Sequence, residues 1–77
     1  MSLRRLGEVV RTAQGLAVVR CPDEDRPDIG IEAVDESLSA VGRVVDVFGP
    51  VEQPYLAVSP AGDATPDRLV GTTLYAR

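Results

Sequence analysis

The run Val41-Gly42-Arg43-Val44-Val45-Asp46-Val47-Phe48-Gly49-Pro50-Val51 decides the fold, because it reads as one β-strand followed by a sharp stop. Valine is enriched in strands, where its branched side chain packs well on a pleated surface. Gly49 can take a positive φ and Pro50 lacks a backbone N–H, so the strand is expected to end at Phe48. A second proline, Pro54, precedes Tyr55, and a strand can begin there without losing a ladder hydrogen bond. The sequence therefore predicts a hairpin whose loop is stiffened by two prolines.

Short runs rich in valine, leucine and isoleucine recur along the rest of the chain, and seven glycines and six prolines separate them. Breakers this closely spaced favour short strands over long helices. The predicted strands cover residues 5–11, 16–20, 29–34, 41–48, 55–59 and 72–76, and the predicted loops cover residues 21–28 and 60–67. The strand at 29–34 is the weakest. A helical turn within 32–40 is the alternative, because the Glu, Ala and Leu side chains there favour helix.

Six short strands in 77 residues predict an all-β protein with a single domain, residues 1–77, built as a small six-stranded β-barrel. A closed barrel is expected rather than a sandwich, because closure leaves few free strand edges that could pair with other chains.

The central strand, residues 41–48, is largely apolar on both of its faces. Strand alternation places four residues on each face: Val41, Arg43, Val45 and Val47 on one, and Gly42, Val44, Asp46 and Phe48 on the other. A barrel this small has one interior, so either a loop of this chain or another protein must cover the second apolar face. Asp46 is expected to accept a hydrogen bond from the backbone or from an arginine, and Phe48 joins either the core or the docking face.

The composition excludes most catalytic machinery. There is no histidine, so neither a Ser-His-Asp triad nor a histidine acid–base pair can form. Cys21 is the only cysteine, which excludes an internal disulfide and a Cys/His zinc cluster, and we expect it to be a buried thiol at a strand end. Asp35, Asp46 and Glu52 remain as acid–base groups, but no nucleophile or cofactor loop accompanies them. The sequence predicts a protein that is not an enzyme and holds no cofactor and no metal.

All eight positive charges are arginine, and twelve acidic residues give a formal net charge of −4. Either a GC-rich genome or adaptation to a salty cytoplasm explains this balance. The acidic excess favours the second, because concentrated salt screens clustered carboxylates. The acidic run 23–28 lacks the ligand spacing of a calcium loop and is expected to be a solvated loop. A negative chain without lysine is also a poor candidate for binding phosphate groups on its own.

Membrane and export signals are missing from the sequence. No apolar run approaches the ~20 residues that a membrane-spanning helix needs. Nothing after Arg4 and Arg5 resembles the apolar segment of a signal peptide. We therefore expect a cytoplasmic protein that binds no membrane and no small-molecule substrate.

The run from Val41 to Val51, followed by Pro54 and Tyr55, resembles the core signature of the Gar protein family, the small subunits of the H/ACA ribonucleoprotein. The most specific part is Phe-Gly-Pro-Val, then two residues, then Pro-Tyr. Shorter similarities extend the resemblance over nearly the whole chain: Arg5-Leu6-Gly7, Val34-Asp35, Val70-Gly71 and Leu74-Tyr75. The chain has no Gly/Arg-rich tail, as in the short archaeal form, and its acidic, lysine-free composition departs from the basic members and suggests a halophilic archaeon.

This resemblance implies a six-stranded β-barrel, in agreement with the strand count. It also implies a non-catalytic subunit of the guide-RNA pseudouridylation complex that binds the pseudouridine synthase catalytic subunit and assists substrate loading, turnover and release in rRNA pseudouridylation. Guide RNA and substrate rRNA would be contacted only indirectly, and the catalytic aspartate would belong to the synthase. Together with the stiff loop and the second apolar face, the resemblance predicts these contacts with the synthase: Val44, Phe48, Gly49, Pro50, Val51, Pro54 and Tyr55.

A second family offers an alternative. Val34-Asp35 and, a few residues later, the run from Val41 to Val47 resemble the PRC-barrel pattern. That pattern implies a small protein-interaction barrel of the kind found in ribosome-maturation proteins. It does not require Gly49-Pro50-Val51 with Pro54-Tyr55, so the Gar family is the better match.

Overall fold

The structure of the chain is a computed structural model that describes residues 4–22, 27–62 and 65–77. The described part contains six strands and one short helix, in chain order β1 (Arg4–Ala13), β2 (Leu16–Arg20), β3 (Glu32–Val34), β4 (Ala40–Phe48), β5 (Tyr55–Pro60), α1 (Pro66–Leu69) and β6 (Thr73–Ala76). The six predicted strands are confirmed, with β3 shorter than expected. Most of the acidic run 23–28 lies outside the described residues.

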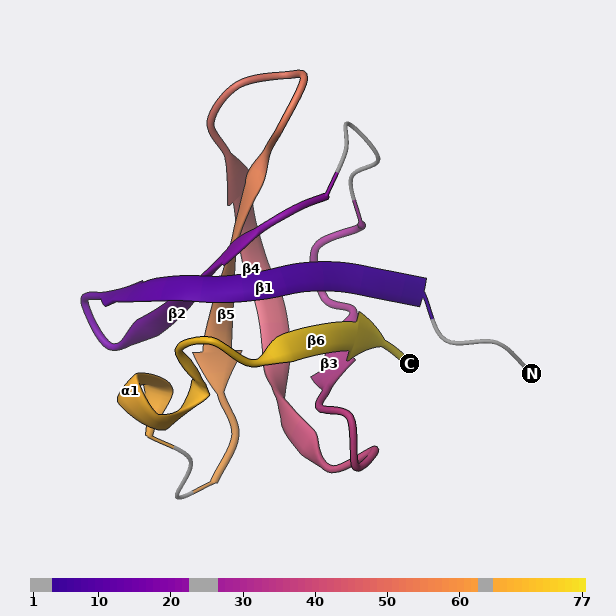
Figure 1. Cartoon of the computed structure of the whole chain (residues 1–77), viewed down its shortest axis with the longest axis vertical. Helices are drawn as coiled ribbons and strands as arrows, with labels where there is room; N and C mark the ends of the chain where they lie inside the picture. Colours follow the sequence, from indigo (N-terminus) through magenta and orange to yellow (C-terminus); the bar gives the residue numbers. More distant parts are fainter. Residues whose placement is uncertain (1–3, 23–26, 63–64) are drawn as a thin grey trace.

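The sheet closes into an antiparallel barrel with the strand order β1-β2-β5-β4-β3-β6. The first strand completes the closure by pairing with the last, because Arg4 of β1 lies in register with Ala76 of β6. In Figure 1, β1 and β6 run across the view, while β4 and β5 run from top to bottom and are joined by a loop that projects at the top. The predicted six-stranded β-barrel is therefore confirmed.

The barrel interior holds an apolar core to which every strand contributes. The core consists of Leu6, Val9, Ala17, Val19, Cys21, Ala33, Val41, Val44, Leu56, Val58 and Leu74. Cys21 follows β2 directly and is buried, which confirms the prediction of a buried thiol at a strand end. At Gly42 a Cβ would collide with the backbone carbonyl oxygen of Ser59, so glycine is what lets β4 and β5 approach each other here.

Two local predictions are wrong. The segment 60–67 is not wholly a loop, because α1 begins at Pro66, where a missing N–H costs no helical hydrogen bond, and Leu69 at its end packs against the core. The alternative of a helical turn within 32–40 is wrong as well. There the carboxylate of Asp35 accepts the backbone N–H groups of Ser37 (2.9 Å) and Ser39 (3.0 Å), which fixes a turn between β3 and β4.

With α1 four residues long, the described ranges hold no helix of the length and apolarity that crossing a bilayer requires.

Candidate protein-docking surface

A β-bulge in β4 determines which side chains face outward. β4 pairs with β5 on both sides of Val45, which has no partner of its own in the ladder. One extra residue shifts the alternation of the strand by one position. Asp46 and Phe48 therefore face outward, whereas simple alternation predicted that they share the face of Val44. Val47 instead packs against the core.

Residues in register across neighbouring strands form rows whose side chains share one side of the barrel wall. Two such rows face the interior: Val9, Val19, Leu56, Val47 and Thr12, Ala17, Val58, Val44. Two others face outward: Glu8, Arg20, Tyr55, Phe48 and Arg11, Val18, Ala57, Asp46. One outer row is apolar or aromatic at Tyr55 and Phe48, and the other is apolar at Val18 and Ala57. The barrel wall there is therefore apolar on both sides.

Two of the seven predicted contact residues are buried, which corrects their assignment. Val44 precedes the bulge, and its side chain lies wholly inside the barrel. Pro54 is buried too, and its carbonyl oxygen accepts the backbone N–H of Cys21 (3.0 Å). Neither side chain offers surface to a partner. Pro54 instead joins the end of the hairpin loop to β2.

The other five predicted contact residues lie together at the projecting end of the β4–β5 hairpin (Figure 1). The rings of Phe48 and Tyr55 stack, with centroids 5.8 Å apart and planes inclined by 22°. Gly49 has a φ of +90°, and a Cβ there would lie 2.8 Å from Cδ2 of Tyr55, so only glycine fits beside this ring. Pro50 and Val51 are exposed, Val51 to 63%. Their contact with a partner stays a prediction.

Exposed apolar side chains are concentrated around this hairpin. Six large apolar side chains are exposed in the part of the chain that the structure describes. Four of them belong to β4, to the loop after it, or to the turn before β3: Val45, Phe48, Val51 and Ile29. The other two, Leu38 and Val70, follow β3 and α1. The β4–β5 hairpin thus carries three of these six side chains, Val45, Phe48 and Val51, and is the main concentration of exposed apolar groups.

A hollow of about 270 Å³ opens on the outer side of β2, β5 and β4. It is lined by Ala13, Gln14, Leu16, Val18, Asp46, Phe48 and Ala57. Because Phe48 also belongs to the aromatic stack, the hollow adjoins the hairpin end. We call it the Phe48 hollow. Most of its lining is apolar, so it is suited to holding an apolar group.

Asp46 stands at the rim of the Phe48 hollow and is exposed. Its Oδ1 accepts the backbone N–H of Val47 at 2.8 Å. The predicted backbone hydrogen bond is confirmed, but on the outer surface rather than on a face shared with Val44. Across residues 4–22, 27–62 and 65–77, no three acidic or cysteine side chains gather closely enough to hold a metal ion.

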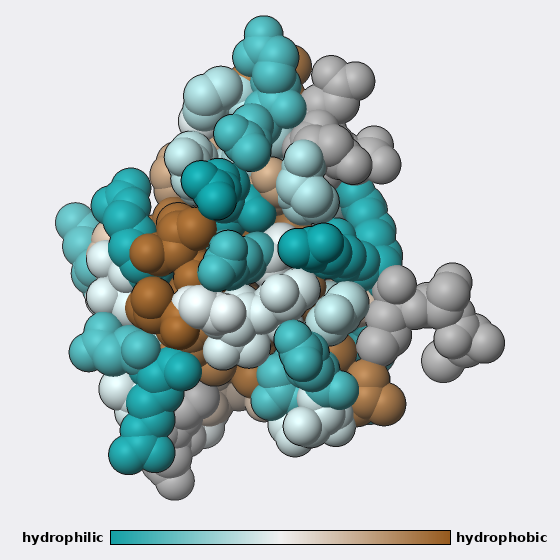
Figure 2. All heavy atoms as spheres, viewed as in Figure 1, coloured by the Kyte–Doolittle hydropathy of each residue, from teal (hydrophilic) through white to brown (hydrophobic). Residues whose placement is uncertain are grey.

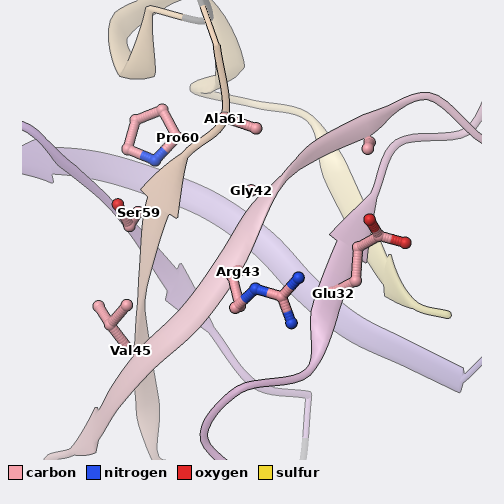
Figure 3. A pocket seen from close by; sticks show the side chains of 8 residues that line it. Glu32, Gly42, Arg43, Val45, Ser59, Pro60 and Ala61 are labelled. Carbon is pink, nitrogen blue, oxygen red and sulfur yellow. The ribbon is translucent and has the colours of Figure 1, made fainter.

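A groove of about 320 Å³ lies on the outer side of β3, β4 and β5, towards the start of β4 (Figure 3). The side chain of Arg43 extends across it towards Glu32 on β3. Arg43 donates from Nη1 to the carbonyl oxygen of Gly30 (2.7 Å), and Glu32 pairs with Arg77 (3.3 Å). Both charged groups therefore already have partners within the chain, and the groove is a weaker candidate site than the Phe48 hollow.

The sequence reasoning missed the floor of the Phe48 hollow. Val18 and Ala57 form that floor, and each lies in an unbroken apolar run: Leu16-Ala17-Val18-Val19 in β2 and Leu56-Ala57-Val58 in β5. A strand with one face in water alternates apolar and polar residues, and these two runs do not alternate. That absence of alternation is the signal that could have located the hollow.

Comparison with known proteins adds a distant relative. No protein-family model matches the chain. The chain is similar to a protein of Methanothermobacter thermautotrophicus (strain Delta H) described as "Uncharacterized protein", with 25% identity over 76 residues that make up 95% of this chain and 82% of that protein. The similarity covers most of this chain, but the relative's description names no activity and no partner.

Proposed function

We propose that the protein is a non-catalytic subunit of an H/ACA guide-RNA pseudouridylation complex. In this proposal the end of the β4–β5 hairpin docks on the catalytic subunit of the pseudouridine synthase. The barrel then assists substrate loading, turnover and release, while guide RNA and substrate rRNA are contacted only indirectly. The proposal places the protein in the cytoplasm of a salt-adapted archaeon and assigns the chemistry to the synthase.

One observation carries this proposal. The residues that resemble the Gar signature most specifically are also those at which apolar side chains reach the surface. Phe48, Val51 and Tyr55 stand at the end of a hairpin that projects from the barrel (Figure 1). Exposed apolar groups gathered in this way support a protein interaction site at the hairpin end.

The construction of the loop also favours docking. Pro50 and Pro54 restrict its backbone, Gly49 lies against the Tyr55 ring, and the carbonyl of Pro54 is tied to Cys21. A loop that is already ordered loses little conformational entropy when it binds, so more of the interaction free energy appears as affinity. A hydrophobic, preformed loop is what a permanent subunit contact needs.

The test is a binding titration with the purified pseudouridine synthase catalytic subunit of the same organism. Val51→Glu would place an unpaired charge in the contact and should weaken binding by about thirtyfold, which corresponds to about 2 kcal/mol. Val70→Glu is the matched control, because Val70 is an exposed valine (48%) that follows α1 rather than the hairpin. It should bind like the wild type, and both variants should melt like the wild type.

Two results would contradict the proposal. Wild-type protein that does not bind the synthase subunit would exclude the proposed function itself. Val51→Glu protein that folds normally and binds with unchanged affinity would remove the loop from the contact.

A further inference from the structure

The floor of the Phe48 hollow is built from apolar side chains on the outer side of the barrel wall. Val18 and Ala57 face outward and do not belong to the side-chain cluster that fills the barrel interior. Even so, they are only 2% and 5% exposed, because the walls of the hollow rise around them. Outward positions of a small barrel ordinarily carry polar side chains. An apolar floor at the bottom of an outward hollow suits an apolar group that enters from outside.

The row that contains this floor has opposite charges at its two ends. Arg11 of β1 lies in register with Val18, and Asp46 of β4 lies in register with Ala57. Both charged side chains are exposed. Asp46 uses Oδ1 for the N–H of Val47, and a carboxylate has room for further donors. A partner segment that binds across the floor therefore has the Arg11 guanidinium on one side and the Asp46 carboxylate on the other.

The hollow is also continuous with the proposed docking loop. Phe48 forms one wall of the hollow, and its other neighbour is the ring of Tyr55. A partner that covers the stacked rings would thus reach the hollow across the Phe48 side chain. In Figure 2 teal and near-white residues make up most of the face that β1 presents, and brown residues gather in a smaller area at its left.

We propose that the Phe48 hollow receives one large apolar side chain of the pseudouridine synthase catalytic subunit. The segment that carries this side chain presents a cationic group towards Asp46 and a carboxylate towards Arg11, so the two charges set its direction across β2, β5 and β4. A buried anchor residue surrounded by complementary charges is the usual composition of an interface hot spot. This inference rests on the proposed function and adds the position and chemistry of the main anchor.

The test places a larger side chain at Ala57, so that it occupies the hollow. Ala57→Leu projects outward into the hollow and should weaken binding to the purified synthase subunit by about tenfold or more, because the anchor side chain loses its place. Ser59→Leu is the matched control: it lies on the outer side of the same strand, in register with Arg43, and lines the other groove instead. It should bind like the wild type. Asp46→Asn keeps an acceptor for the Val47 N–H and should weaken binding about threefold at low salt, with less effect at high salt.

The outcomes separate this inference from the proposed function. If Val51→Glu weakens binding and folded Ala57→Leu does not, the hollow is not the anchor site and the docking function stands. Equal losses for Ala57→Leu and Ser59→Leu would also overturn the inference, because the effect would then belong to the whole of β5. If Ala57→Leu lowers the melting temperature, Ala57→Ser replaces it. Serine keeps the size of alanine but makes the floor polar, so unchanged affinity of this variant would overturn the inference as well.

Discussion

Leu38 is held in a backbone conformation that leucine disfavours. Its φ is +66°, in the left-handed region, and its side chain is 51% exposed. The surrounding turn keeps it there, because its N–H donates to the carbonyl oxygen of Asp35 (3.0 Å), whose carboxylate is bonded to Ser37 and Ser39. A left-handed backbone costs a residue with a Cβ on the order of 1 kcal/mol or more. Leu38 gains little in return, because its side chain is mostly exposed.

We therefore predict that Leu38→Gly stabilises the isolated barrel. Glycine removes the left-handed penalty, which outweighs its greater freedom in the unfolded chain, so the free energy of unfolding should rise by about 0.5–1 kcal/mol. Thermal melts followed by circular dichroism measure the change. Val70→Gly is the control, because Val70 has a φ of −58° and gains nothing from glycine. If both variants melt at lower temperature than the wild type, relief of the left-handed backbone does not govern stability here.

At the scale of strands, the bulge at Val45 positions the candidate site. It brings Asp46 and Phe48 to the outside and returns Val47 to the core. We predict that deleting Val45 preserves cooperative unfolding, because Asp46 then follows Val44 directly and regular alternation keeps Asp46 and Phe48 outside and Val47 in the core. Deleting Glu52 from the exposed hairpin loop is the control and should also leave a cooperative melt. Loss of cooperative unfolding for the Val45 deletion alone would contradict this assignment of the extra residue.

The sequence predicted the strands well and their faces less well, for physical reasons. Glycine and proline mark where a strand must stop, so the ends of the hairpin strands could be located to within a residue or so. The bulge leaves no such mark, since Val44 and Val45 are identical residues and only pairing with β5 shows which one is extra. The exposure of the Val51 side chain could be predicted from its place in the hairpin loop. The position of Pro54, by contrast, depends on a hydrogen bond with Cys21, which is distant in sequence. The floor of the Phe48 hollow likewise exists only once β2 and β5 are neighbours.

For the whole molecule, charge is distributed unevenly over the barrel. In the described residues of β1 and β2, four arginines stand against one acidic residue, Glu8. The segment from Asp28 to Glu36 reverses this balance, since it carries four acidic residues and no base. The one ion pair formed among the described residues, Arg77 with Glu32, has both side chains partly exposed. Such an exposed ion pair contributes little to the free energy of unfolding, so salt that screens it removes little stability.

We predict that the melting temperature rises between 0.1 M and 2 M KCl. Salt screens repulsion among twelve acidic residues and strengthens apolar burial, and both effects stabilise the folded state. The measurement is a series of thermal melts at constant pH. Sucrose at matched osmolality serves as the control, because it strengthens burial without screening charge. A flat or falling melting temperature in KCl would contradict adaptation to a salty cytoplasm.

The pairing of β1 with β6 has a consequence for biosynthesis. Arg4 and Ala76 are neighbours in the ladder, so β1 meets β6, its second partner, only after the whole intervening sequence has been translated. Until Thr73–Ala76 has emerged, the nascent chain exposes open strand edges on β1 and β3. The pairing of β5 with β2 and β4 does not depend on β6, so it can be complete before β6 emerges. The surface that we assign to the synthase is thus ready early, and an associating partner could hold the nascent barrel while its seam is still open.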